Sequence, residues 1–294
     1  MDENKWLAQQ FEAHKSHLRA VAYRMLGSLS EADDAVQESW LHLSRAGTEG
    51  VENLGGWLTT VVARVCLDQL RSRKARPEEP LGARMPEEIV EREGGGNPES
   101  EVLLADSVGL ALLVVLDTLA PPERLAFVLH DLFGLSFDEI APIVGRSPTA
   151  ARQLASRARR RVQGGAAKPE ADIRRQREVV EAFLAAAHGG GLDALLLVLD
   201  PEVVIRVDPV ALPPGAPTEV RGARIVGGNA IAFSSRSRFA QPALVNGAVG
   251  LIVAPLGQLS MALLFTIVGS KVTELELIAE PARLRLLDFA VLPA

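Results

Sequence analysis

The sequence predicts a multidomain protein in which two all-α domains precede an α+β domain with a curved antiparallel sheet. Apolar residues recur with the period of a helix as far as about residue 200, and beyond it they alternate as in strands. Two segments that contain proline or glycine, 77–98 and 164–172, interrupt the pattern. With 294 residues, the chain is long enough for two or three domains. We expect domains at 1–76, 99–163 and 173–294.

Three helices are expected in the first domain. Apolar residues at helical spacing fill 5–26 and stop at Gly27, and Ser30 is the expected N-cap of a second helix. The outer face of that helix is acidic and partly apolar, with Asp34, Gln37, Glu38 and Leu41. Such a face either binds a basic partner or is simply solvated.

A third helix is predicted from Trp57 to Arg76, where Pro77 stops it. It combines an aromatic residue with a basic C-terminal half: Trp57, Arg64, Arg71, Arg73 and Lys74. Aromatic and basic side chains together suit single-stranded nucleic acid, whose bases stack and whose phosphates pair with arginine. Trp57 taken alone is better explained as a core anchor.

The second all-α domain follows an acidic linker, since 77–98 has two Lys and Arg against six Asp and Glu. Asn97-Pro98 opens a predicted helix that ends at Leu119, and Pro121 begins another that ends near Phe133.

A helix-turn-helix is predicted over residues 136–162. Ser136 and Glu139 have the spacing of a capping box, Gly145 can end the first helix, and Ser147-Pro148 can begin the second. Pro142 is expected to kink the first helix, because it removes a backbone donor.

The second helix of this motif has an apolar stripe and an open polar face. Between residues 146 and 161 there are six arginines and no acid. Guanidinium groups can pair with phosphates and donate two hydrogen bonds to a guanine edge. The alternative is an ordinary solvated helix end. The candidate DNA-binding residues are Thr149, Arg152, Gln153, Ser156, Arg157 and Arg160.

Overall composition limits the location and chemistry of the chain. The net charge of −6 hides the local basic clusters, and Cys66 is the single cysteine, so neither an intramolecular disulfide nor a cysteine-based zinc site is possible. We expect no metal and no cofactor. The N-terminus lacks the pattern of a signal peptide, so a cytoplasmic location is expected. Residues 239–270 carry no charge, but Pro255 and Gly257 favour two buried strands over a membrane span.

The last domain is expected to begin with helices and continue with strands. Helical patterns cover 173–187 and 192–199, and 222–239 mixes helical and loop signals. Strands are predicted at the following places: 202–208, 244–253, 259–268, 271–278 and, as a possibility, 284–289.

The order of these parts resembles a bacterial sigma factor of the extracytoplasmic-function group. Residues 30–40, SEADDAVQESW, are similar to the region 2 segment that grips RNA polymerase, and residues 57–76 to the part that melts and reads the −10 element. Residues 97–162 resemble region 4, whose last helix enters the major groove at −35. Residues 173–294 resemble the SnoaL-like α+β cone of one branch of the group. That branch's Asp-Gly-Gly-Gly-Lys stretch is replaced here by residues 207–213.

The resemblance implies a sigma factor that binds core RNA polymerase and promoter DNA, with its SnoaL-like domain contacting the sigma domains and modulating them in cis. The resemblance implies that the face with Asp34, Gln37, Glu38 and Leu41 binds polymerase. The set that begins with Trp57 would contact the −10 element, and the set that begins with Thr149 would contact the −35 element. An operator-binding regulator with a ligand-sensing C-terminal domain is the alternative. An enzyme is not expected, because the C-terminal part offers few residues for acid–base chemistry. After residue 170 the main candidates are His188, in a glycine-rich loop, and Asp208, and an aspartate at a strand end is more often a turn former.

Overall fold

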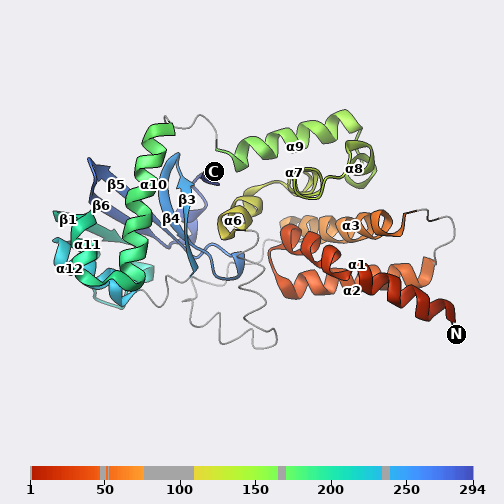
Figure 1. The fold of residues 1–294 in the computed structure, drawn as a ribbon, viewed down its shortest axis with the longest axis horizontal. Coiled ribbons are helices and arrows are strands. Elements are labelled where there is room, and N and C mark those ends of the chain that lie inside the picture. Colours follow the sequence, from red (N-terminus) through yellow and green to blue (C-terminus); the bar gives the residue numbers. More distant parts are fainter. Residues whose placement is uncertain are drawn as a thin grey trace. The chain divides into compact units, whose positions relative to one another are not determined.

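The computed structural model describes residues 2–46, 51, 53–75, 109–164, 170–233 and 239–293 (Figure 1). These residues divide into two compact units. The first contains the N-terminal helices, the end of helix α6 from Leu116 and the helices that follow as far as Arg160. The second contains the start of α6 and the chain from Arg161 onward.

Three helices form the N-terminal part: α1 (Asp2–Leu26), α2 (Leu29–Ala46) and α3 (Leu54–Ala75). Their inner faces bury Leu18, Leu43 and Leu58 completely. The start of α2 differs from the prediction, because the Ser28 hydroxyl, not that of Ser30, accepts a hydrogen bond from the Glu31 amide at 3.4 Å. The helix therefore begins one residue before the expected cap.

Region 109–162 contains the predicted helix-turn-helix. Its elements are α6 (Leu110–Thr118), α7 (Pro121–Phe127), the π-helical turn η1 (Val128–Leu132), α8 (Phe137–Val144) and α9 (Pro148–Val162). The predicted opening at Asn97-Pro98 lies outside the described residues. Helix α8 continues through Pro142, whose ring is exposed.

A buried arginine joins these helices to the N-terminal three. Arg124 of α7 is 2% exposed, and its Nε donates to the carbonyl of Arg24 at 3.2 Å, at the C-terminal end of α1. One terminal nitrogen donates to Asp117 at 3.1 Å. Burial lowers the pKa of Arg124, while Asp117 acts in the opposite direction. The guanidinium therefore acts as a cap for the carbonyl end of α1, where a positive charge is favourable.

A second contact between these two parts involves aromatic groups. The ring of His17 in α1 meets that of Phe133 edge to face, with 5.2 Å between centroids, and the Arg24 guanidinium lies 5.2 Å from the same Phe133 ring. The Thr59 hydroxyl lies 3.3 Å from His17 Nε2. Burial, together with the neighbouring His14, lowers the pKa of His17. The neutral imidazole is thus favoured at this contact.

The C-terminal domain is a seven-stranded sheet in the order β2-β1-β6-β5-β4-β3-β7, counted over the described residues. The strands are β1 (Leu199–Val207), β2 (Glu219–Arg221), β3 (Ala240–Val245), β4 (Ala248–Val253), β5 (Met261–Val268), β6 (Lys271–Ile278) and β7 (Phe289–Ala290). All neighbouring pairs are antiparallel except β1 with β6, which are parallel. The α+β expectation is confirmed, and the sheet is mixed.

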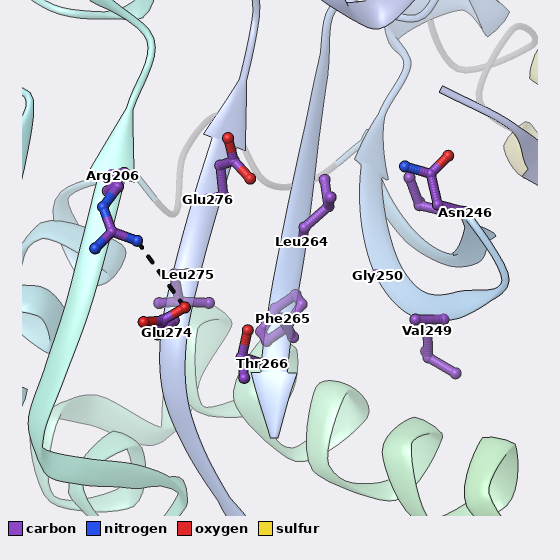
Figure 2. A pocket seen from close by; sticks show the side chains of 12 residues that line it. Arg206, Asn246, Val249, Gly250, Leu264, Phe265, Thr266, Glu274, Leu275 and Glu276 are labelled. Carbon is purple, nitrogen blue, oxygen red and sulfur yellow. Dashed lines mark ion pairs between the residues drawn. The ribbon is translucent and has the colours of Figure 1, made fainter. Parts of the chain in front are cut away.

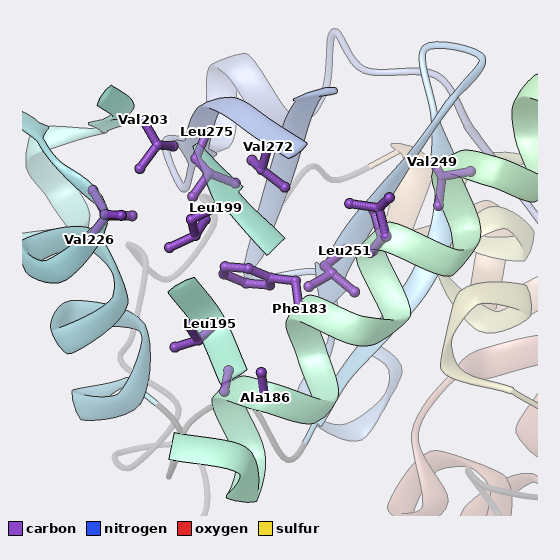
Figure 3. Close-up of a cluster of buried hydrophobic side chains, with 14 of the residues drawn as sticks. Phe183, Ala186, Leu195, Leu199, Val203, Val226, Val249, Leu251, Val272 and Leu275 are labelled. Atoms are coloured by element: carbon purple, nitrogen blue, oxygen red, sulfur yellow. The ribbon is translucent and has the colours of Figure 1, made fainter. Parts of the chain in front are cut away.

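One face of the sheet packs against helices α10 (Glu170–Ala185), α11 (Gly191–Val198) and α12 (Ala223–Ala232), with the π-helical turn η2 (Ala186–Gly190) between the first two. Figure 3 shows Phe183 of α10 between the sheet residue Leu251 and Leu195 of α11. Side chains of these helices and of alternate strand positions make one buried cluster. The space between helices and sheet is thus occupied by apolar side chains.

Two strand predictions were wrong in their boundaries. The single strand expected at 244–253 is a hairpin, because Asn246 and Gly247 have φ of 51° and 74° and turn the chain between β3 and β4. The segment 284–289 is instead the end of helix α13 (Pro281–Leu284), a short connection and the start of β7. The predicted strand pair across Pro255 is confirmed as β4 and β5, joined through the 3₁₀ turn η5 (Pro255–Gly257).

Three contacts within the second unit join the sheet to the ends of 109–162. The amide of Val291, after β7, donates to the carbonyl of Val162 at 2.8 Å. A Cβ placed on Gly164, where φ is 79°, would lie 3.2 Å from that of Ala290. At the other end, the Ala111 amide donates to Gln241 Oε1 at 3.4 Å. The segment from Gly164 onward was predicted as a linker, yet its first residue is packed against β7.

Among the described residues, no helix is both long and apolar enough to cross a membrane.

Replacement of Arg124 by alanine should lower the free energy of unfolding of the first unit by about 2–5 kcal/mol, because it leaves a cavity in place of a buried side chain and takes the donor from the carbonyl of Arg24. Trp6, Trp40 and Trp57 all lie in α1–α3, so tryptophan fluorescence during urea unfolding reports on this unit. Arg160→Ala is the control, since Arg160 is exposed and should change stability by less than about 0.5 kcal/mol. Equal stabilities of the two variants would contradict the capping role.

Candidate nucleic-acid interface

Local hydrogen bonds set the geometry of the helix-turn-helix. The Ser136 hydroxyl accepts from the Glu139 amide at 3.3 Å, and Glu139 Oε2 accepts from the Ser136 amide at 2.9 Å. Hydrogen bonds from Ser136 hold the pKa of Glu139 below its usual value. Gly145 has φ of 67° and ends α8, and the Ser147 hydroxyl accepts from the Ala150 amide at 3.2 Å as α9 begins. Each predicted cap of the motif is confirmed.

Helix α9 buries its small apolar side and exposes its polar side. Ala151, Ala155 and Ala158 are fully buried, so α9 lies close against its neighbours. All six predicted DNA-binding side chains are exposed: Thr149, Arg152, Gln153, Ser156, Arg157 and Arg160. The polar side of α9 is therefore exposed, and its role in binding DNA stays a prediction.

The arginines on α9 differ in what holds them. Arg157 Nε donates to Glu123 at 2.8 Å and Arg159 Nε to Asp131 at 2.7 Å, and the two acidic side chains are 14% and 18% exposed. Arg152 instead lies over the ring of Phe137, 5.2 Å from its centroid. Sequence patterns had marked Phe137 only as an apolar residue, because its partner is fifteen positions away.

The predicted −10 residues divide between two sides of α3. Trp57, Arg64 and Arg71 are seven residues apart, which places them on one side of a helix. Trp57 is half-buried and the two arginines are exposed. Arg73 lies on another side, where it pairs with Glu31 of α2. The side chain of Lys74 lies outside the described part of the chain.

The predicted polymerase-binding face of α2 is a continuous exposed surface. Asp34, Gln37, Glu38 and Leu41 follow the helical repeat, and all four are exposed. Leu41 is 45% exposed and adds an apolar group to this acidic surface. Such a surface suits a partner that offers basic groups around an apolar contact.

The C-terminal domain has a cavity of about 210 Å³ on the sheet face opposite the helices (Figure 2). Arg206, Glu274 and Glu276 line it, and each has an ion-pair partner. Arg206 pairs with Glu219 at 3.0 Å and lies 3.9 Å from Glu274, while Glu276 pairs with Arg283. These charges therefore compensate one another.

Neither Asp208 nor His188, the acid–base candidates, lines that cavity, although Asp208 shares Arg283 with the lining residue Glu276. The Asp208 carboxylate accepts from the amides of Ala279 and Glu280 at 3.0 and 3.1 Å and pairs with Arg283. Burial alone would raise the pKa of Asp208, but these hydrogen bonds hold it below its usual value. It is a bonded turn residue, whereas His188 is exposed in η2. No cluster of three or more metal-ligating side chains occurs within the described ranges.

Comparison with known families identifies both helical parts. The family described as Sigma-70 region 2 matches residues 10–76, and Sigma-70, region 4 matches residues 109–162.

Relatives extend the match to the C-terminal domain. The chain is 32% identical over 295 residues to a probable ECF RNA polymerase sigma factor, SigI, of Mycobacterium tuberculosis, covering 97% of both chains. It is 40% identical over 253 residues to SigJ of the same species, covering 84% of this chain and 81% of SigJ. The crystal structure of SigJ aligns with a TM-score of 0.48 at 34% identity, covering 93% of this chain and 96% of that one. With region 2, region 4 and a C-terminal extension in this order, the chain belongs to the extracytoplasmic-function group of sigma-70 family sigma factors.

Proposed function

We propose that the chain is a promoter-specificity subunit of RNA polymerase, and that its SnoaL-like C-terminal domain modulates it in cis. In this proposal, the α2 face binds core polymerase, α3 binds the −10 element and α9 reads the −35 element. The domain boundaries are 1–76, 99–163 and 173–294, and the protein acts in the cytoplasm without a cofactor. The observation that carries the proposal is the exposed polar face of α9, on a capped helix-turn-helix in a chain that belongs to this family.

Family membership favours this function over the operator-binding regulator that the sequence left open. A regulator of that kind needs α9 but has no use for the exposed face of α2. Asp208, bonded on both oxygens, also lacks the freedom of a general base, which supports a C-terminal domain that acts by contact.

Modulation in cis is supported by the contacts at Val162 and Ala111. These residues are near the two ends of 109–162, and both are bonded by residues of the C-terminal domain. A shift of β3 or of the chain after β7 would therefore act on region 4 from both ends.

A Leu41→Asp change should weaken binding to core RNA polymerase by at least about tenfold, because an unpaired charge at the centre of an interface is costly. The measurement is a titration of the fluorescently labelled full chain with core polymerase. Leu132→Asp is the matched control, as Leu132 is also an exposed leucine but lies in η1. Equal affinity of the two variants would refute the assignment of the α2 face.

A Gly164→Ala change should speed hydrogen exchange of the Val291 amide by about 5- to 30-fold, because a left-handed backbone costs an L-residue roughly 1–2 kcal/mol. Promoter-dependent transcription should change in the same variant. Gly189→Ala is the control, since no atom lies within 4 Å of a Cβ placed there. Control through this contact would be excluded if Gly164→Ala alone raised the exchange rate of the Val291 amide while both variants gave the same amount of transcript.

A further inference from the structure

Three side chains from three elements form a stack beside the exposed face of α9. The rings of His130 in η1 and Phe137 in α8 have centroids 4.0 Å apart and are inclined by 31°. The Arg152 guanidinium lies over the Phe137 ring at 5.2 Å. His130 Nδ1 lies 2.8 Å from the carbonyl of Leu135, to which it donates, so the imidazole is fixed to the turn that precedes α8.

The backbone explains why these groups meet. A π-helical turn adds a residue to the helical repeat and redirects the side chains that follow, and such turns often occur at functional sites. Here η1 carries His130, while the capping box at Ser136 fixes Phe137 as the first residue of α8. Both rings are therefore held by hydrogen-bonded backbone.

The stack leaves the N–H groups of Arg152 available. Arg157 and Arg159 each donate Nε to a carboxylate in the same domain. An aromatic face attracts a guanidinium without accepting its in-plane N–H bonds. Among the described residues, no hydrogen bond or ion pair of Arg152 is found beyond this contact.

We propose that Phe137, supported by His130, is a positioning residue that holds Arg152 ready to donate two hydrogen bonds to one base edge in the major groove. Guanine is the base whose O6 and N7 fit such a fork. Holding the long side chain in place before binding reduces the rotamer entropy lost on binding. Specificity at one base pair then depends on a ring that does not itself touch the base. This inference rests on the proposed role of α9 at the −35 element.

A double-mutant cycle in the reconstituted holoenzyme tests the coupling. The probe is the duplex that the wild-type holoenzyme enriches from a randomised promoter library, together with its single-base-pair variants. Arg152→Ala should abolish discrimination at one base pair, and Phe137→Leu should reduce discrimination at that same pair by about 3- to 10-fold. Phe137→Leu should have no further effect when Arg152 is already alanine, whereas Phe137→Tyr should keep wild-type discrimination.

Two controls separate positioning from general damage to the fold. Phe137→Met also lacks a ring and serves if Phe137→Leu does not fold, as judged by circular dichroism. Arg160, near the C-terminal end of α9, is expected to contact a phosphate, so Arg160→Ala should weaken binding to all sequences alike. Its effect should add to that of Phe137→Leu.

Additive effects of Phe137→Leu and Arg152→Ala on discrimination would overturn the positioning role while leaving Arg152 as a reader of DNA. The same conclusion would follow if Phe137→Leu weakened every duplex equally. If Arg152→Ala left base preference unchanged, the proposed role of Arg152 at the −35 element would fail as well, so the two failures are distinguishable.

Discussion

Every α-helix leaves its first amides and last carbonyls without partners inside the helix, and in this chain those partners often come from another segment. Arg124 bonds the carbonyl end of α1, Gln241 bonds an amide at the start of α6, and Val291 bonds the last carbonyl of α9. Local caps at Ser28, Ser136 and Ser147 satisfy other ends. Several helix ends are thus places where distant segments of the chain are hydrogen-bonded to one another.

The arginines of α9 also differ in whether residues of other elements hold them. The chain has a net charge of −6, yet α9 carries a basic surface, because it has five arginines and no acidic residue. Acidic residues of neighbouring elements pair with two of these arginines, Arg157 and Arg159. Glu123 and Asp131 fix Arg157 and Arg159 at the rim, whereas Arg152 is held by a ring. Arginines that look equivalent in the sequence therefore differ in how many donors they can offer to DNA.

Features that depend on neighbours in the sequence were predictable, and those that depend on distant partners were not. The capping box at Ser136, the αL residue Gly145 and the exposed face of α9 follow from local spacing, and the structure confirms them. The hairpin at Asn246 was missed because two apolar strands on either side of a tight turn look like one strand. The burial of Arg124 had no local signal, since it depends on the carbonyl of Arg24, one hundred residues away in the sequence. The parallel pairing of β1 with β6 likewise depends on strands more than sixty residues apart.

The proposed function requires that the chain direct transcription from a promoter. Run-off transcription with core RNA polymerase and the enriched promoter duplex, with and without the full chain, decides this. We predict a transcript of defined start that requires the chain and disappears with the Leu41→Asp variant. Absence of any transcript from the wild-type chain, although it binds both core polymerase and the duplex, would contradict the proposed function.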